Sequence, residues 1–193
     1  MANAFEQITS MLLEREGYWT RTRYKVNLTK EEKVLIEIPS SPRWELDVLA
    51  YDPRVNLLLV VECKSYLNSS GVRYLAFTGT DKNGAKRYKL FTNEPLRRVV
   101  LARLRKQLRR EGLILPKAQI RLCLAAGRIQ GGKEGQLDAY CRKRGWGLFT
   151  PGWFSDKFAG LAGTAYEDDI AVVAAKLAAN GNGKSSMANH GRK

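Results

Sequence analysis

The sequence predicts an α/β protein in which a central mixed β-sheet is flanked by helices. Three observations predict this class. Apolar residues alternate with polar ones in some segments and recur at helical spacing in others. Helix-like and strand-like segments alternate through the second half of the chain. The 193 residues, 44% of them hydrophobic, are enough for one sizeable core. Helices are expected at residues 4–16, 95–111, 135–144 and 166–179, and strands at residues 18–28, 44–51, 57–66, 119–126 and 146–150.

The first elements follow from local patterns. The opening helix has apolar residues near helical spacing and ends before Gly17. Residues 18–28 alternate basic residues with apolar or aromatic ones, which is typical of a strand. A shorter apolar piece at residues 34–38 ends at Pro39. The next two strands are predicted to form a hairpin around Asp52-Pro53 and Asn56, which are turn residues.

The later elements are less uniform. Residues 67–93 are polar, basic and rich in Gly, Asn and Thr, so we interpret them as an insertion or irregular hairpin outside the core. The helix at residues 95–111 has one apolar stripe and is otherwise dominated by arginine, and Gln107 is expected to face away from the stripe. A single domain is therefore expected over residues 1–179, followed by a flexible tail at residues 180–193.

The charge balance predicts the class of partner. There are 33 Lys and Arg residues against 19 Asp and Glu, a formal net charge of +14. Such a surface favours a polyanion, because binding to phosphates releases counterions. Nucleic acid is the expected partner. The alternatives are a solubility device and an RNA binder without chemistry.

Cysteine and histidine usage excludes several chemistries. Cys63, Cys123 and Cys141 are odd in number and lack metal-ligand spacing, which indicates reduced thiols in a cytoplasmic protein, nucleoid-associated if it binds DNA. The first residues do not resemble a signal peptide, and no apolar run approaches the ~20 residues of a membrane span, so no membrane partner is expected. The one histidine, His190, lies in the polar tail, which excludes histidine-based triads and metal sites.

Three charged residues of the predicted hairpin carry the candidate chemistry. Glu62 and Lys64 are two residues apart on one strand, so their side chains leave the same face. A two-residue loop at Arg54-Val55 would place Asp47 directly opposite Glu62. A loop at Pro53-Arg54 would place Asp47 one diagonal step away on the same face, whereas an odd loop would separate the residues.

Two carboxylates and an ammonium group suit metal-assisted phosphodiester hydrolysis. Asp47 and Glu62 offer the hard oxygen ligands that Mg²⁺ or Mn²⁺ prefers. Lys64 would orient or help deprotonate the attacking water, or offset charge in the transition state. Glu45 lies two residues before Asp47 and is a competing ligand or neighbour.

This pattern resembles the PD-(D/E)xK, or restriction-endonuclease-like, nuclease superfamily. Asp47 matches the first acidic residue, and Glu62-Cys63-Lys64 matches the (D/E)xK motif, although Leu46 stands where the name-giving proline would be. The resemblance spans residues 4–126 and implies a helix, three-strand, helix, strand core with endonuclease or exonuclease activity on DNA. It also implies that Glu6, on the first helix, joins the metal ligands.

Basic side chains in two segments are candidates for contacts with nucleic acid. Each segment could equally be a solvated surface. The candidates are Lys82, Lys86, Arg87 and Lys89, interleaved with aromatic residues, and Arg97, Arg98, Arg103 and Arg105 on the arginine-rich helix.

Two other functions remain open from the sequence. One is a nucleic-acid-binding module that keeps the fold without catalytic turnover, and the other is an accessory subunit whose basic surface docks on a nucleoprotein. Cleavage of a duplex with one active site per chain would favour a homodimer.

Overall fold

The computed structural model describes residues 3–37, 43–165 and 167–185. The chain divides into two compact units, Met1–Thr150 and Pro151–Lys193. The range expected for a single domain, residues 1–179, covers the first unit and part of the second.

The first unit is built on one five-stranded sheet with the strand order β1-β2-β3-β4-β5. β1, β2 and β3 pair antiparallel, while β3, β4 and β5 pair parallel. The mixed sheet predicted from the sequence is thus confirmed. The strands are β1 (Trp19–Val26), β2 (Trp44–Asp52), β3 (Leu57–Lys64), β4 (Gln119–Ala126) and β5 (Gly147–Phe149).

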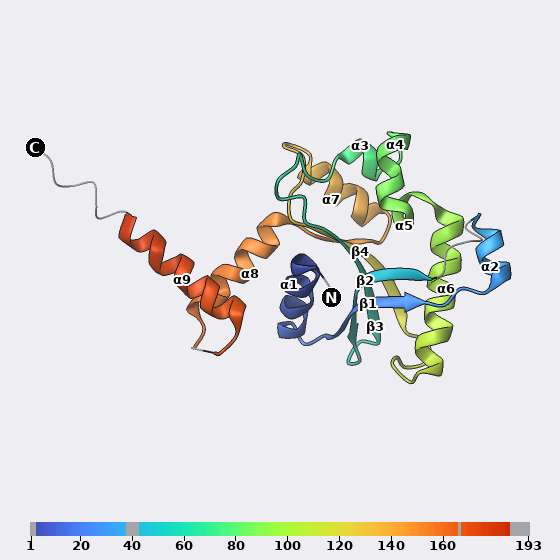
Figure 1. Ribbon diagram of the computed structural model, residues 1–193, viewed down its shortest axis with the longest axis horizontal. Coiled ribbons are helices and arrows are strands. Elements are labelled where there is room, and N and C mark those ends of the chain that lie inside the picture. The colour runs from blue at the N-terminus through green and yellow to red at the C-terminus, as the bar shows by residue number, and fades with distance from the viewer. Residues whose placement is uncertain (1–2, 38–42, 166, 186–193) are drawn as a thin grey trace, which may run out of the picture. The chain divides into compact units, whose positions relative to one another are not determined.

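Helices lie on both sides of this sheet. α1 (Ala4–Arg15) lies on one side and α6 (Glu94–Arg110) on the other (Figure 1). α7 (Glu134–Lys143) connects β4 to β5 and contributes Leu137 to the same core as α6. These three helices match the predicted ranges within one or two residues.

The short helix α2 (Lys30–Leu35) was not predicted. It includes part of the apolar piece expected at residues 34–38, and Ile38 and Pro39 lie outside the described residues. The side chain of Thr29 accepts a hydrogen bond from the Glu32 N–H, and the Glu32 carboxylate accepts one from the Thr29 N–H. This reciprocal capping begins the helix.

The interpretation of residues 67–93 as an insertion outside the core is wrong. This segment forms α3 (Tyr74–Phe77), α4 (Lys82–Ala85), η1 (Lys86–Tyr88) and α5 (Lys89–Thr92). Phe77 is completely buried, and its ring lies 4.6 Å from that of Phe91, centroid to centroid. The aromatic residues of this segment point inward, and the basic residues between them face outward. The average composition of the segment is therefore polar and basic, and it did not indicate that the aromatic residues belong to the core.

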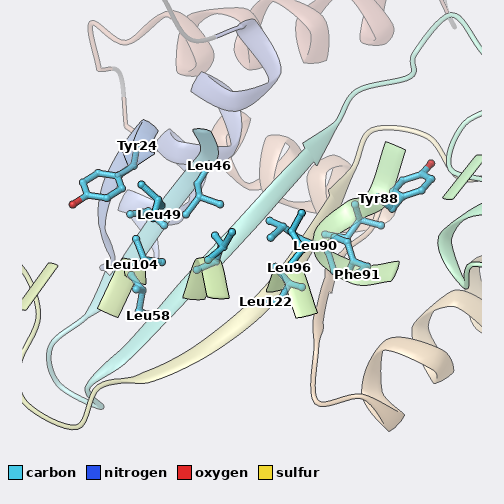
Figure 2. Close-up of a cluster of buried hydrophobic side chains, with 14 of the residues drawn as sticks. Tyr24, Leu46, Leu49, Leu58, Tyr88, Leu90, Phe91, Leu96, Leu104 and Leu122 are labelled. Carbon is cyan, nitrogen blue, oxygen red and sulfur yellow. The ribbon is translucent and has the colours of Figure 1, made fainter. Parts of the chain in front are cut away.

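The main core lies between the sheet and α6 (Figure 2). It joins Leu49, Leu58 and Leu122 of three strands to Leu96 and Leu104 of α6. The helix periodicity predicted this apolar stripe.

The expectation for Gln107 is wrong, because its side chain is buried. Its amide oxygen accepts a hydrogen bond from the Asn27 N–H at 3.0 Å, and its amide nitrogen donates one to the Lys25 carbonyl at 3.0 Å. Gln107 therefore joins α6 to the end of β1, where these backbone groups need partners.

The second unit consists of α8 (Pro151–Gly163), which was not predicted, and α9 (Ile170–Ser185). Lys176 of α9 donates a hydrogen bond to the Ala162 carbonyl of α8 at 3.0 Å. α9 continues six residues into the segment expected to be a flexible tail, and residues 186–193, including His190, lie outside the described part. Over the residues described, no helix combines the length and apolar character needed to cross a membrane.

Candidate active site

The β2–β3 turn sets the register of the candidate site. The ladder runs from Asp52↔Leu57 to Val48↔Val61, which is the register expected for a loop centred on Arg54-Val55. The Asp52 carboxylate accepts hydrogen bonds from the N–H and the guanidinium of Arg54, each at 2.9 Å. These contacts stabilise the turn and thereby hold Asp47 in register with Glu62.

β2 and β3 separate beyond this ladder. The part of β2 before Val48 remains paired with β1, and the part of β3 after Val61 remains paired with β4. The Asp47 carboxylate accepts a hydrogen bond from the Cys63 N–H at 2.7 Å. The aspartate side chain therefore spans the opening between the strands, where a backbone ladder would otherwise continue.

A distortion of β1 lies across from Asp47. The register passes from Thr22↔Val48 to Tyr24↔Leu46, and Arg23 between them has a left-handed backbone with φ of 52°. The Thr20 hydroxyl contacts Ser10 of α1, whereas the Tyr24 hydroxyl donates to Glu111 beyond α6 at 2.7 Å. With regular alternation, Thr20 and Tyr24 would lie on the same face of the sheet. They instead contact residues on opposite faces, so the alternation of side chains along β1 reverses between them.

Glu62 and Lys64 form an ion pair at the end of β3. Lys64 Nζ lies 2.7 Å from Glu62 Oε1, and each side chain is 19% exposed. Burial by itself would lower the pKa of Lys64, but the charges of Glu62 and Asp47 outweigh it and raise the pKa above its ordinary value. Lys64 therefore keeps its proton at neutral pH.

Asp47 belongs to the same electrostatic cluster. Burial and the charge of Glu62 raise its pKa to about 6, against the opposing effects of the Cys63 N–H and Lys64. The predicted neighbours Asp47, Glu62 and Lys64 thus act on one another at one end of the sheet. Two carboxylates face one ammonium group there, in a chain whose formal net charge is +14.

Glu6 is adjacent to this cluster but has a structural role. It is buried, and its carboxylate closes a capping box with Asn3 at the start of α1. Burial, and then the charge of Asp47, raise its pKa. Across residues 3–37, 43–165 and 167–185, no three His, Cys, Asp or Glu side chains are grouped so that they could hold a metal ion. Glu6 is engaged in this cap, and its predicted role as a third metal ligand stays a prediction.

Glu45 lies beside the cluster, and its charge helps to raise the pKa of Asp47. Its carboxylate accepts a hydrogen bond from Arg23 Nε at 2.9 Å, and the side chains of Glu45 and Arg23 are 38% and 41% exposed. Glu45 is therefore an electrostatic neighbour of Asp47, and its role as a competing ligand stays a prediction.

The donor chemistry fits a divalent cation held by two residues. Asp47 and Glu62 supply hard carboxylate oxygens, and Mg²⁺ commonly binds through one or two carboxylates and several waters. A cation between them would also relieve the repulsion that raises the pKa of Asp47.

The predicted nucleic-acid contacts separate into distinct groups. Lys82, Lys86 and Lys89 line one hollow of about 340 Å³, while Arg87 is exposed outside it. Arg97 donates to the carbonyls of Leu90 and Phe91 and lies over the Trp146 ring, and Arg103 binds the Glu32 carboxylate. Arg98 and Arg105 line a different hollow, along α6 beside Ile120 of β4.

Arg23 was missed from the sequence. Nothing in the pattern of residues 18–28 marks one position as left-handed, because an arginine there fits the basic and apolar alternation. Only its three-dimensional position across from Asp47 draws attention to it.

Fold and site together define an α/β protein with a helix-flanked mixed sheet and a charged cluster where two strands separate. Comparison with known proteins finds no family model, no curated protein and no solved structure that matches the chain.

Proposed function

We propose that this chain is a metal-dependent nuclease that hydrolyses phosphodiester bonds, as its resemblance to the PD-(D/E)xK superfamily implies. The observation that carries the proposal is the meeting of Asp47, Glu62 and Lys64 where β2 and β3 separate. Charged groups at least partly shielded from water at the end of an apolar strand reduce stability, and such an arrangement is typical of functional sites.

Asp47 and Glu62 would hold Mg²⁺ or Mn²⁺. The cation, when bound, would polarise a phosphoryl oxygen and lower the pKa of a coordinated water. The Cys63 N–H donates a hydrogen bond to one carboxylate oxygen of Asp47, and the other carboxylate oxygen takes no part in this bond. Preorganisation of this kind reduces the rearrangement that ligand binding requires.

Lys64 would stabilise charge and not act as a base. Its pKa is raised above the ordinary lysine value, so it cannot accept a proton at neutral pH. Its ammonium group would offset the negative charge that develops on the phosphoryl oxygens. Glu62, 2.7 Å away, orients this group.

Nucleic acid is the substrate class that the charge of the protein favours. A formal net charge of +14 attracts polyanions from a distance, while the local excess of carboxylates at the site attracts a divalent cation. DNA is proposed before RNA on the basis of the family resemblance alone.

The alternative is a nucleic-acid-binding module without turnover. The capping box of Glu6 favours it, because this carboxylate is engaged at the start of α1 and is less free to bind a cation. Binding of nucleic acid without cleavage under any divalent cation would support this second function.

The test is cleavage by the purified chain. Plasmid, linear duplex, single-stranded DNA and RNA would be incubated with Mn²⁺, with Mg²⁺ or with a chelator, using wild-type protein and the variant Lys64→Ala. We expect metal-dependent cleavage of at least one substrate and a loss of about a hundredfold in Lys64→Ala. Cleavage that persists in chelator, or at an equal rate in the variant, would reject the assignment.

A further inference from the structure

A basic hollow lies along α6 beside Ile120 of β4, and the proposed active site does not use it. It has a volume of about 860 Å³. Its floor is apolar and is formed by Leu101, Ala102 and Ile120. Its walls carry five cationic side chains and no acidic one, namely Arg98, Arg105, Lys106, Arg109 and Arg110.

Of these five cations, Lys106 acts electrostatically on the Glu32 carboxylate. In the part of the chain that the structure describes, none of them lies in an ion pair. Arg97 and Arg103 of the same helix differ, because they are engaged by backbone carbonyls and by Glu32. The arginines of α6 thus divide into a set that holds the fold together and a set that faces solvent in one hollow.

The spacing of the solvent-facing set matches an extended polyanion. Arg98 and Arg109 are eleven residues apart, which corresponds to about 16 Å along a helix. Phosphates of one strand of a duplex advance about 3.4 Å each, so this length spans roughly five of them. A small anion would occupy only a fraction of the hollow, whereas a phosphodiester backbone would meet the successive cations.

The hollow is separate from the candidate active site. Ile120 pairs with Leu58 on β3, and Leu58 precedes Glu62 by four residues, or about 13 Å along the strand. α6 and α1 also lie on opposite sides of the sheet, and Glu6 of α1 neighbours Asp47 (Figure 1). A strand segment in the hollow is therefore not the segment that meets Lys64.

We propose that this hollow is a second nucleic-acid-binding surface, which holds a phosphodiester backbone away from the site of cleavage. The proposal rests on the proposed function only in that nucleic acid is the class of substrate. It does not require that the protein cleaves that substrate. The surface supplies affinity that is independent of base sequence, because it offers cations to phosphates and no directed contact to bases.

The experiment measures binding in the absence of divalent cations. Fluorescein-labelled duplex and single-stranded DNA and RNA would be titrated in chelator with wild-type protein and the triple variant Arg98→Gln, Arg105→Gln, Arg109→Gln. The control triple variant Lys25→Gln, Lys30→Gln, Lys143→Gln changes the net charge equally at exposed positions outside the hollow. Equal thermal midpoints would establish that both variants fold.

We expect the hollow variant to bind at least tenfold more weakly near 0.1 M salt. A plot of the logarithm of the association constant against the logarithm of the salt concentration has a negative slope. The magnitude of this slope should decrease by about 2.7, which is roughly 0.9 for each phosphate that the variant no longer neutralises. The control should change little, because its three lysines do not line the hollow.

Equal effects of the two triple variants would overturn the proposal, as would undetectable wild-type binding to every nucleic acid. Nucleic-acid binding that the hollow variant retains, together with poly-glutamate binding that it loses, would identify the hollow as a site for acidic protein and would also overturn the proposal. Binding is measured in chelator, where no cleavage is expected. The proposed cleavage and the proposed binding in the hollow are therefore tested by separate measurements.

Discussion

The carboxylate of Asp47 accepts a hydrogen bond from the Cys63 N–H at 2.7 Å, across the opening between β2 and β3. The contact substitutes for the ladder that ends at Val48↔Val61. It holds a carboxylate that is partly buried and repelled by Glu62, so the arrangement reduces stability in the absence of a cation.

The substitution Asp47→Asn should raise the thermal midpoint at pH 8 in chelator. In the folded protein the pKa of Asp47 is about 6, against an ordinary 3.8, so folding favours the protonated form. The ionised form destabilises the folded state fully above pH 6, and this effect disappears as pH falls from 6 to about 4. Asparagine cannot ionise, so the stability gain of the variant should shrink over the same interval in thermal unfolding curves.

Asp52→Asn is the matched control for that experiment. Hydrogen bonds from Arg54 lower the pKa of Asp52, so its ionised form stabilises the fold above the ordinary pKa and this contribution is lost as pH falls. Asp52→Asn should therefore lower the thermal midpoint at pH 8. A gain in both variants would contradict the electrostatic account of Asp47.

Cleavage should depend on pH through Asp47. At a low, fixed concentration of Mn²⁺, single-turnover rates should rise with pH up to about 6 and then flatten, because only ionised Asp47 binds a cation. Higher Mn²⁺ should move the midpoint to lower pH, since the cation competes with the proton. A midpoint that does not respond to Mn²⁺ would remove Asp47 from the ligand set.

Arg23→Gly should give a protein more stable than Arg23→Ala by about 1 kcal/mol. The backbone of Arg23 is left-handed, with φ of 52°, which glycine adopts without the steric penalty of a Cβ atom. Both substitutions remove the ion pair with Glu45 equally. Urea denaturation would measure the difference.

Thr22 provides the control for Arg23, because it is paired in the ladder and its φ is not positive. There the order should reverse, with glycine less stable than alanine by roughly 0.5–1 kcal/mol. The same order at both positions would mean that the backbone distortion next to Asp47 does not exist in solution.

Phe77→Ala should destabilise the first unit by about 3–5 kcal/mol. Phe77 is completely buried among the rings of Tyr88, Phe91 and Trp146. Leu75→Ala, two residues away at a side chain 56% exposed, should change stability by no more than about 0.5 kcal/mol. Similar values for the two variants, from denaturant unfolding, would show that residues 67–93 lie outside the cooperative core.

The parts predicted from the sequence are those with strong periodicity. α1, α6, β3 and β4 each carry an uninterrupted apolar pattern, and their ranges were predicted within about two residues. The neighbourhood of Asp47, Glu62 and Lys64 could also be predicted, because the parity of a hairpin register determines which residues share an edge.

The parts that could not be predicted depend on tertiary contacts. Gln107 is buried because it satisfies backbone groups of β1 and the following loop, and helical periodicity contains no information about them. Phe77 and Phe91 join the core from short helices in a basic, glycine-containing segment. These helices are too short to show a hydrophobic pattern with the helical period of 3.6 residues. The reversal of facing at Arg23 similarly depends on one backbone torsion.

Single-turnover cleavage by Asp47→Asn and Glu45→Gln, measured side by side with wild type in saturating Mn²⁺, tests the central claim most directly. The two carboxylates are two residues apart on β2, but only Asp47 is directed to Cys63, Glu62 and Lys64, while Glu45 pairs with Arg23 at the surface. We predict that Asp47→Asn loses about a hundredfold or more in rate and that Glu45→Gln stays within about threefold of wild type. Cleavage by Asp47→Asn at the wild-type rate would contradict the account.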